Sequence, residues 1–189
     1  MSSGKKWRAL PAVTAAALAL ALAACGSSSG GGSSSSGGGG TKAKTVGVIL
    51  PDATTSPRWE ANDRPSLTKA FTDAGLKSDI QNAGGDKAKF GTICDAMINE
   101  GVAVIMIVNL DSDSGGACLK KAAAAGIKSI DYDRLTLGGG ASYYVSFDNV
   151  KVGALMATGL EQCLGAKAQG AGVVYVNGDL TDNNAVLFK

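Results

Sequence analysis

The adjacent residues Asp133 and Arg134 directly follow an apolar strand predicted at residues 127–132, where neither side chain suits a helix cap. A carboxylate beside a guanidinium combines paired acceptors with five donors in a fixed fork, which matches the vicinal hydroxyl groups of a polyol. The indole of Trp59 offers a flat apolar face to the C–H side of a sugar ring. Two structural interpretations stay open: the pair can be an ion pair of the fold, and Trp59 can fill the core.

Further polar residues follow the other predicted strands. In an open α/β sheet, ligands bind beyond the carboxyl ends of the strands, where loops and helix N-termini converge. The additional residues expected at this edge are Asp52, Arg58, Asn109, Asp111, Asp182, Asn183 and Asn184. Aspartate also caps helices and forms turns, and this alternative applies to Asp111, Asp113, Asp148 and Asp182.

Other chemistries lack the residues that they require. The chain contains no histidine, which excludes Ser-His-Asp and Cys-His catalysis in their usual forms and most catalytic zinc sites. It carries no glycine-rich phosphate-binding fingerprint and no nucleophile elbow. No two carboxylates stand at a defined separation that indicates a glycosidase. We therefore expect no catalytic residue, no metal site and no cofactor.

Short β-branched apolar runs alternate with longer amphipathic stretches beyond residue 41, which predicts an α/β fold with a doubly wound parallel sheet. The predicted strands are residues 45–50, 77–81, 102–108, 127–132, 143–147 and 172–176. The predicted helices are residues 59–74, with Pro65 as a kink or as the first turn, then 86–100, 115–125 and 149–164, and a last helix that begins near residue 182. In the second of these, Asp86 is the expected N-cap and Gly101 the expected end.

Two lobes are expected from this pattern. Residues 45–147 supply one α/β layer, which we assign as an N-terminal ligand-binding lobe. Residues 148–189 repeat the start of the same pattern, and so short a stretch cannot bury a core of its own. We assign it as the incomplete start of a second, similar lobe.

The N-terminal segment has the pattern of a lipoprotein signal peptide. A basic stretch precedes an apolar run at residues 9–22, which is too short to span a membrane as a mature helix. The run ends in Leu-Ala-Ala-Cys at residues 22–25, which resembles a bacterial lipobox. We expect removal of residues 1–24 and lipidation of Cys25. An ordinary signal peptide followed by an incidental cysteine is the alternative.

A flexible tether is expected after the lipidated cysteine. Residues 26–40 are all Ser or Gly, which behave as a flexible coil, and we assign residues 25–44 as the lipidated cysteine with its tether. The exported protein is then anchored by lipid alone to the outer face of the bacterial cytoplasmic membrane, or faces the periplasm.

The net charge of +2 changes sign when the signal peptide is removed. Three of the 18 Lys and Arg residues precede residue 25, and the remaining 15 against 16 Asp and Glu leave −1. The exported protein therefore has no basic excess that would attract nucleic acid, and we expect no nucleic-acid partner.

Several motifs of the chain together resemble the type I periplasmic sugar-binding proteins of ABC importers, most closely the D-xylose-binding proteins. These motifs are Arg58-Trp59, Gly101-Val102, Asp131-Tyr132-Asp133-Arg134, Ser146-Phe147-Asp148-Asn149, and Asp182-Asn183-Asn184 with Leu187-Phe188. The folded part of such proteins is about twice as long, so the resemblance implies that this chain is truncated at its C-terminus.

The resemblance also implies a function and a set of ligand-binding residues. A monosaccharide such as xylose is expected between two lobes, delivered to an ABC permease without catalysis. The implied ligand-binding residues are Arg58, Asp133, Arg134, Asp182 and Asn184, with Trp59 as the stacking face. A truncated fragment that binds nothing, and a subunit that presents sugar to a membrane receptor, are the alternatives.

Three cysteines remain when Cys25 is assigned to the anchor, namely Cys94, Cys118 and Cys163. An odd number in an exported protein indicates a free thiol, an intermolecular pair or a missing partner. Cys94 and Cys118 lie on consecutive predicted helices of one sheet face, and we hypothesise that they form a disulfide. Cys163 is then left for a downstream partner.

Overall fold

The computed structural model describes residues 44–54 and 56–189. The predicted signal peptide, the predicted lipidation site Cys25 and nearly all of the predicted tether lie outside these residues. Within the described ranges, no helix combines the length and the apolar character that crossing a bilayer requires. The same ranges hold no group of three or more His, Cys, Asp or Glu side chains arranged to bind a metal ion.

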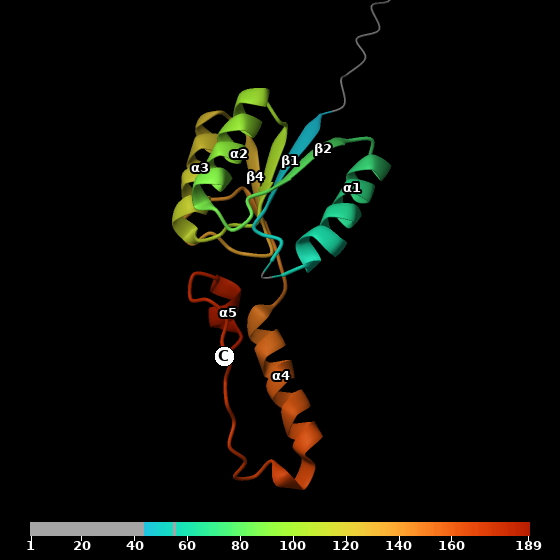
Figure 1. The fold of residues 1–189 in the computed structure, drawn as a ribbon, viewed down its shortest axis with the longest axis vertical. Helices are drawn as coiled ribbons and strands as arrows, with labels where there is room; N and C mark the ends of the chain where they lie inside the picture. Colours follow the sequence, from blue (N-terminus) through green and yellow to red (C-terminus); the bar gives the residue numbers. More distant parts are fainter. Residues whose placement is uncertain (1–43, 55) are drawn as a thin grey trace, which may run out of the picture. The chain divides into compact units, whose positions relative to one another are not determined.

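A five-stranded parallel sheet forms the centre of the fold (Figure 1). Its strand order is β2-β1-β3-β4-β5. Strand β1 therefore pairs with β2 on one side and with β3 on the other. The strands are β1 (Thr45–Leu50), β2 (Lys77–Asn82), β3 (Val104–Ile107), β4 (Lys128–Tyr132) and β5 (Tyr143–Val145). The predicted doubly wound parallel sheet is confirmed, and the reversal of strand order falls between β1 and β3.

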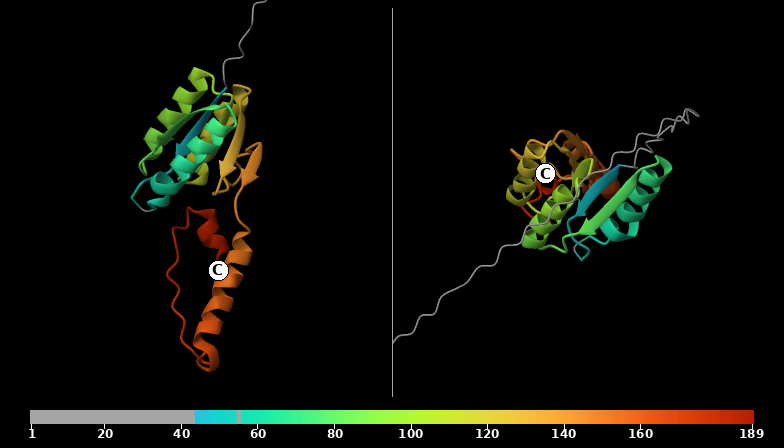
Figure 2. Two further views of the ribbon diagram at one scale, coloured as in Figure 1. Left: turned by 90° about the vertical axis from the view of Figure 1, so that its right-hand side faces the viewer. Right: turned by 90° about the horizontal axis from the view of Figure 1, so that it is seen from above.

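The central strands are apolar on both faces because helices cover both faces (Figures 1 and 2). Helix α1 (Arg64–Asp73) lies on one side, and α2 (Lys87–Glu100) and α3 (Ser112–Ala124) lie on the other. Val48 of β1 faces the α1 side, in a cluster with Trp59, whereas Ile49 faces the α2 and α3 side, in a cluster with Phe90.

The strand β3 is shorter than the predicted 102–108, although its ladder continues. The N–H of Ala103 donates to the carbonyl of Thr45 (2.8 Å), and the N–H of Val108 donates to the carbonyl of Ile49 (2.9 Å). The apolar run therefore pairs with β1 beyond both ends of β3. The predicted range matches this hydrogen bonding, although the regular strand is shorter.

Helices α2 and α3 show how local signals set helix limits. Asp86 caps α2 as predicted, with its carboxylate accepting from the N–H groups of Ala88 and Lys89, and Gly101 ends the helix in a left-handed conformation. Helix α3 begins at Ser112 instead of the predicted residue 115, because Asp111 caps it through the N–H of Ser114 (2.7 Å). The capping interpretation of Asp111 is therefore correct.

A disulfide joins Cys94 of α2 to Cys118 of α3, with a Cα–Cα distance of 5.9 Å. Both residues belong to the cluster between these helices and the sheet. This is the pair proposed from the predicted helix order. Cys163 is an exposed free thiol.

The first helix begins with a π-helical turn instead of the uniform helix predicted at residues 59–74. The turn η1 (Trp59–Asp63) precedes α1, and the N–H of Arg64 donates to the carbonyl of Trp59, five residues earlier. Pro65 lies in the first turn of α1, a position at which a helix tolerates proline. The first-turn interpretation of Pro65 therefore holds.

Residues 148–189 carry helices but no strand. Helix α4 (Asn149–Leu164), capped by Asp148, is followed by the short helix η2 (Gly165–Lys167) and, after an extended stretch, by α5 (Asn183–Leu187), which contacts α4. The predicted strand at residues 172–176 is wrong. A strand requires a neighbour for its backbone hydrogen bonds, and no other strand of the described chain lies beside this segment.

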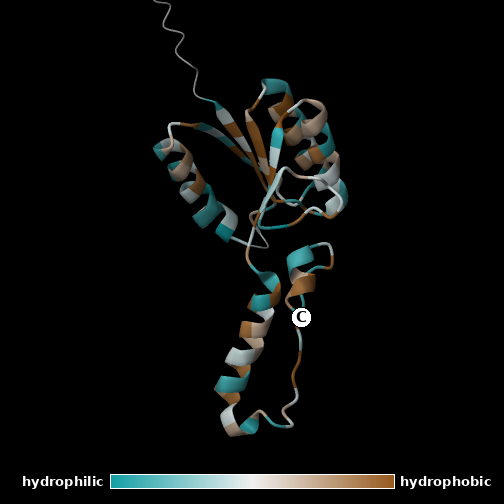
Figure 3. Cartoon of the chain, turned by 180° about the vertical axis from the view of Figure 1, so that it is seen from behind, coloured by the Kyte–Doolittle hydropathy of each residue, from teal (hydrophilic) through white to brown (hydrophobic). Residues whose placement is uncertain are grey.

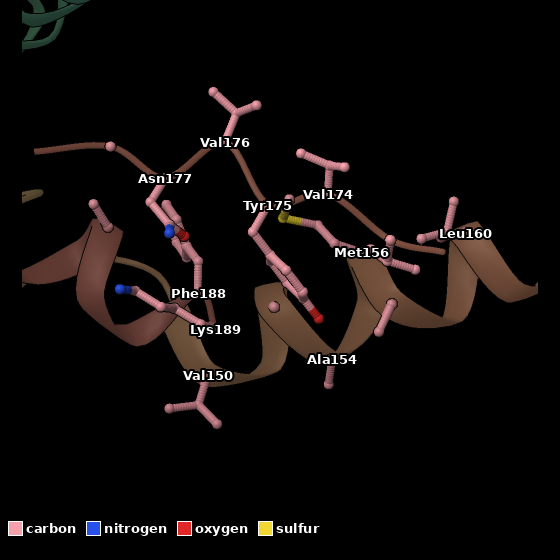
Figure 4. A pocket seen from close by; sticks show the side chains of 15 residues that line it. Val150, Ala154, Met156, Leu160, Val174, Tyr175, Val176, Asn177, Phe188 and Lys189 are labelled. Carbon is pink, nitrogen blue, oxygen red and sulfur yellow. The ribbon is translucent and has the colours of Figure 1, made fainter. Parts of the chain in front are cut away.

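The extended stretch between η2 and α5 carries hydrophobic residues (Figure 3), and several of them are exposed. Val174 is 88% exposed and Val176 is 95% exposed. Between this stretch, α4 and α5 lies a groove of about 610 Å³, lined mainly by apolar side chains that include Met156, Tyr175 and Phe188 (Figure 4). Residues 148–189 therefore have the apolar composition of a hydrophobic core, but the segment contains no sheet to cover these side chains.

Candidate functional site

Three loops and one short helix bring polar side chains together at the carboxyl edge of the sheet. Arg58 follows β1, Asn109 follows β3, and Asp133 and Arg134 follow β4. Asn184 comes from α5, at the other end of the described chain. This edge includes the reversal of strand order between β1 and β3, where open α/β sheets bind their ligands.

Asp133 is the centre of this network and is only 6% exposed. Its Oδ2 lies 2.9 Å from Nη1 of Arg58, in an ion pair. Its Oδ1 accepts from Nδ2 of Asn184 at 2.8 Å. These three residues were predicted to share one site, and in the structure Arg58 and Asn184 each contact Asp133. Both carboxylate oxygens therefore face donors from different segments of the chain.

The backbone at Asp133 has a φ of 66°, and no other non-glycine residue of the described chain has a positive φ. The N–H of Arg134 donates to the carbonyl of Tyr132 at 2.8 Å, which makes Asp133 the centre of a γ-turn of the rarer, strained form. The carbonyl of Asp133 accepts from Oγ of Ser146 (2.6 Å) and from Nδ2 of Asn184 (3.0 Å). These bonds hold the strained turn in place.

Arg134 is directed toward different partners. Its Nη1 donates to the carbonyl of Asn109 at 3.2 Å, and its Nε lies 3.0 Å from Oδ2 of Asp182. The Nε–H does not point at that oxygen, so the contact with Asp182 is an ion pair without a hydrogen bond. Asp182 also caps α5 by accepting from the N–H of Asn184, so it serves as a cap and as an ion-pair partner.

Trp59 is 2% exposed and packs in the cluster on the α1 side of the sheet. The guanidinium carbon of Arg58 lies 4.2 Å from the centroid of its ring, and that of Arg134 lies 5.9 Å away. These are cation–π distances. The core-filling interpretation thus describes Trp59 in this structure, and its stacking role stays a prediction. Its Nε1 is buried without a hydrogen-bond partner in the described chain.

Asp63, a second carboxylate partner of Arg58, was not predicted from the sequence. Oδ2 of Asp63 accepts from Nε of Arg58 (2.9 Å), and Oδ1 accepts from Nη2 of Arg58 (3.1 Å) and from the hydroxyl of Tyr132 (2.7 Å). Burial raises the pKa of Asp63, but the bonds from Arg58 and Tyr132 outweigh burial and lower it. An arginine and an aspartate five residues apart were the only sequence signal, and that spacing does not suit an α-helix.

The other two members of this group keep their ordinary protonation at neutral pH. The hydrogen bond to Asp63 raises the pKa of Arg58, against the effect of burial. Burial, together with the bond to Asp63, raises the pKa of Tyr132 to about 12. The group therefore consists of a guanidinium, a carboxylate and a neutral phenol.

Buried polar groups support the loop that carries Asp133 and Arg134. Asp131 accepts from the N–H and from Oγ1 of Thr136, each at 2.8 Å, and Nδ2 of Asn109 donates to Oγ1 of Thr136 at 2.8 Å. Burial raises the pKa of Asp131, against the effect of these hydrogen bonds. Asn109 was predicted at this edge, and its Nδ2 supports the loop by donating to Thr136 and to the carbonyl of Arg134, the latter at 3.3 Å.

A second residue that the sequence analysis did not assign is Asn149, the first residue of α4. Its Nδ2 donates to Oδ1 of Asn184 at 2.9 Å. Because Oδ1 of Asn184 is engaged in this way, the amide nitrogen of Asn184 faces Asp133. Asn149 thus sets the orientation of a predicted site residue, and its own Oδ1 is buried without a partner in the described chain.

Most of the described chain is similar to known sugar-binding proteins. Residues 46–189 match the family model described as the periplasmic binding protein domain. The chain is 36% identical over 148 residues to the multiple sugar-binding periplasmic receptor ChvE of Rhizobium radiobacter, which covers 76% of this chain and 41% of that protein. It is 34% identical over 132 residues to the D-xylose-binding periplasmic protein of Escherichia coli, which covers 70% of this chain and 38% of that protein.

Solved structures agree with this assignment. An ABC transporter solute binding protein from Clostridium phytofermentans, solved with bound β-D-glucose, superposes with a TM-score of 0.66 at 32% identity, over 77% of this chain and 45% of that one. The chain spans less than half the length of these relatives. The curated relatives are named as a sugar-binding receptor and a sugar-binding protein, and not as enzymes. The resemblance inferred from the motifs is confirmed, and the chain belongs to the periplasmic binding protein family.

Proposed function

We propose that the chain binds a monosaccharide, such as xylose, as the solute-binding component of a sugar ABC importer. The observation that carries this proposal is the network at the carboxyl edge of the sheet, where Arg58, Asp133 and Asn184 meet beside the Arg134–Asp182 pair. The relatives named for D-xylose and for multiple sugars support the choice of ligand class.

The chemistry of the network suits a neutral polyol. A sugar hydroxyl both donates and accepts, so a single hydroxyl can replace the contact between Arg58 and Asp133 by accepting from the first and donating to the second. Adjacent hydroxyls can do the same between Asp133 and Asn184. Hydrogen bonds to charged groups are stronger than those between neutral groups, so the exchange keeps the strong bonds of the site.

Calorimetric titration of residues 25–189 with D-xylose and D-glucose tests the proposal. We expect saturable binding of at least one aldose by the unaltered chain. In Arg134→Ala the affinity should be lower by at least roughly tenfold, since a hydrogen bond to a charged group is lost. Arg64→Ala is the matched control, because Arg64 pairs with Glu60 outside the network. Absence of aldose binding in the unaltered chain, or equal affinity in the Arg134 variant, contradicts the proposal.

We also propose that Cys25 is lipidated and holds the protein on the outer face of the cytoplasmic membrane, close to a permease. The basic stretch, the apolar run at residues 9–22 and the Ser/Gly segment at residues 26–40 support this. Cell fractionation with an alkyne-labelled fatty acid measures it. The unaltered protein should carry the label and be recovered in the membrane fraction. Cys25→Ala should lose the label and leave the membrane fraction, while Ser27→Ala should behave like the unaltered protein. Label retained by the Cys25 variant would rule out this anchor.

A further inference from the structure

We propose that Asp63 and Tyr132 are positioning residues that fix the guanidinium of Arg58 and make the site selective for neutral sugars over acidic ones. The inference rests on the proposed sugar-binding function and extends it to the class of sugar.

Asp63 controls the direction of Arg58. Its carboxylate accepts from Nε and Nη2 of Arg58, at 2.9 and 3.1 Å, in a bidentate pair. A bidentate pair fixes the plane of a guanidinium as well as its place. With these two nitrogens engaged, Nη1 is the nitrogen that points to Asp133, at 2.9 Å. Asp63 therefore determines which edge of Arg58 meets the site.

The π-helical turn makes this pair possible. In an α-helix, residues five positions apart point about 140° away from each other. A π-turn closes hydrogen bonds between residues with that spacing, as the bond from the N–H of Arg64 to the carbonyl of Trp59 shows. Within such a turn, Asp63 lies against Arg58. π-Turns inside α-helices often occur at functional sites, and here the turn delivers the carboxylate.

Tyr132 connects this pair to the strand that carries the rest of the site. Its hydroxyl donates to Oδ1 of Asp63 at 2.7 Å, and it immediately precedes Asp133 in the chain. The loop after β1 is therefore tied to the end of β4 at two adjacent residues, through Tyr132 to Asp63 and through Asp133 to Arg58. This cross-link sets the spacing between the guanidinium and the carboxylate that a sugar must bridge.

Selectivity follows from the charges around Arg58. Two carboxylates, Asp63 and Asp133, face a single guanidinium, and Asp182 faces Arg134. Three negative charges against two positive charges leave this cluster at −1. An anionic sugar derivative therefore meets net repulsion from this cluster, whereas a neutral hydroxyl does not.

The test compares Asp63→Asn with Glu60→Gln. Both remove one carboxylate charge from the same helical turn, but Glu60 pairs with Arg64 and does not touch Arg58. We expect Asp63→Asn to weaken the affinity for the bound aldose about tenfold, and to lower the ratio of that affinity to the affinity for D-glucuronate by a similar factor. Glu60→Gln should leave both quantities within about twofold of the unaltered protein.

A second readout requires no ligand. In a ¹⁵N-labelled sample, the Nε–H signal of Arg58, assigned by its loss in Arg58→Lys, should exchange slowly in the unaltered protein and in Glu60→Gln. It should exchange fast in Asp63→Asn. If Asp63→Asn fails to fold, Tyr132→Phe serves instead, since it removes one oxygen and the hydrogen bond to Asp63, and it should accelerate the exchange and weaken aldose binding about threefold.

The outcomes separate the two proposals. If the unaltered protein binds no aldose, the proposed function fails, and the exchange of the Arg58 signal alone decides the positioning role. If the unaltered protein binds an aldose but Asp63→Asn matches Glu60→Gln in affinity, in selectivity and in exchange, the positioning role is overturned while the proposed function stands. A loss of affinity in Asp63→Asn with an unchanged xylose-to-glucuronate ratio overturns the selectivity.

Discussion

Replacing Asp133 by alanine is expected to weaken aldose binding by roughly a hundredfold or more and to destabilise the fold by about 2 kcal/mol. The substitution removes the acceptor of Nη1 of Arg58 and of Nδ2 of Asn184 at once. The amide of Asn184 is buried, so one of its N–H groups loses its side-chain partner in a place that water does not reach freely. Calorimetry measures the affinity, and urea denaturation measures the free energy of unfolding.

Asp133→Gly is the matched variant for this experiment. It removes the same carboxylate but tolerates the φ of 66° without strain, so it should bind as weakly as the alanine variant and be more stable than it by about 1 kcal/mol. Affinity close to that of the unaltered protein in either variant contradicts the central role of the carboxylate. Equal stability of the two variants contradicts a strained backbone at this residue.

Removing the disulfide has the second large effect that we expect. The bond between Cys94 and Cys118 closes a loop with a sequence separation of 24. In the chain-entropy description, a loop of this size contributes about 3 kcal/mol by restricting the unfolded chain. The double variant Cys94→Ala with Cys118→Ala should therefore unfold at a clearly lower urea concentration, with the free energy of unfolding reduced by about that amount.

Cys163→Ala is the control for the disulfide experiment, because this thiol is exposed and unbonded, and its replacement should leave the urea midpoint unchanged. A reducing agent should shift the midpoint of the unaltered protein and leave that of the double variant in place. An unchanged midpoint in the double variant would show that the bond adds no stability beyond the packing of α2 on α3.

Those parts of the fold that depend on local signals were predictable from the sequence. The continuous apolar run at β1 and β3 predicts strands that are buried on both faces, and such strands imply helices on both sides. Asp86 and Gly101 marked the ends of α2 because the cap and the left-handed residue act within one turn of the helix. The pair Asp133 and Arg134 was recognisable because it directly follows such a strand.

The remaining features could not be predicted. They depend on partners that are distant in the sequence, or on a local geometry that departs from a regular helical period. Residues 172–176 have strand composition, but composition cannot supply the neighbouring strand. The π-turn shifts the helical register, so a uniform α-helical period would point Asp63 away from Arg58. Trp59 has the residue type of a stacking surface, and only its packing shows that the core and the guanidinium of Arg58 cover it.

Groups that bond to each other in the site are far apart in the sequence, and this affects the order in which the chain folds. Tyr132 and Asp63 stand 69 positions apart, and Asn184 and Asp133 stand 51 apart, whereas the two disulfide cysteines stand 24 apart. Contacts between distant residues form slowly, because their loop-closure entropy must be overcome first. During synthesis, α5 emerges after the other segments that form this edge. We expect α2 and α3 to acquire their covalent link early, and the proposed sugar-binding edge to be completed late, when Asn184 reaches Asp133.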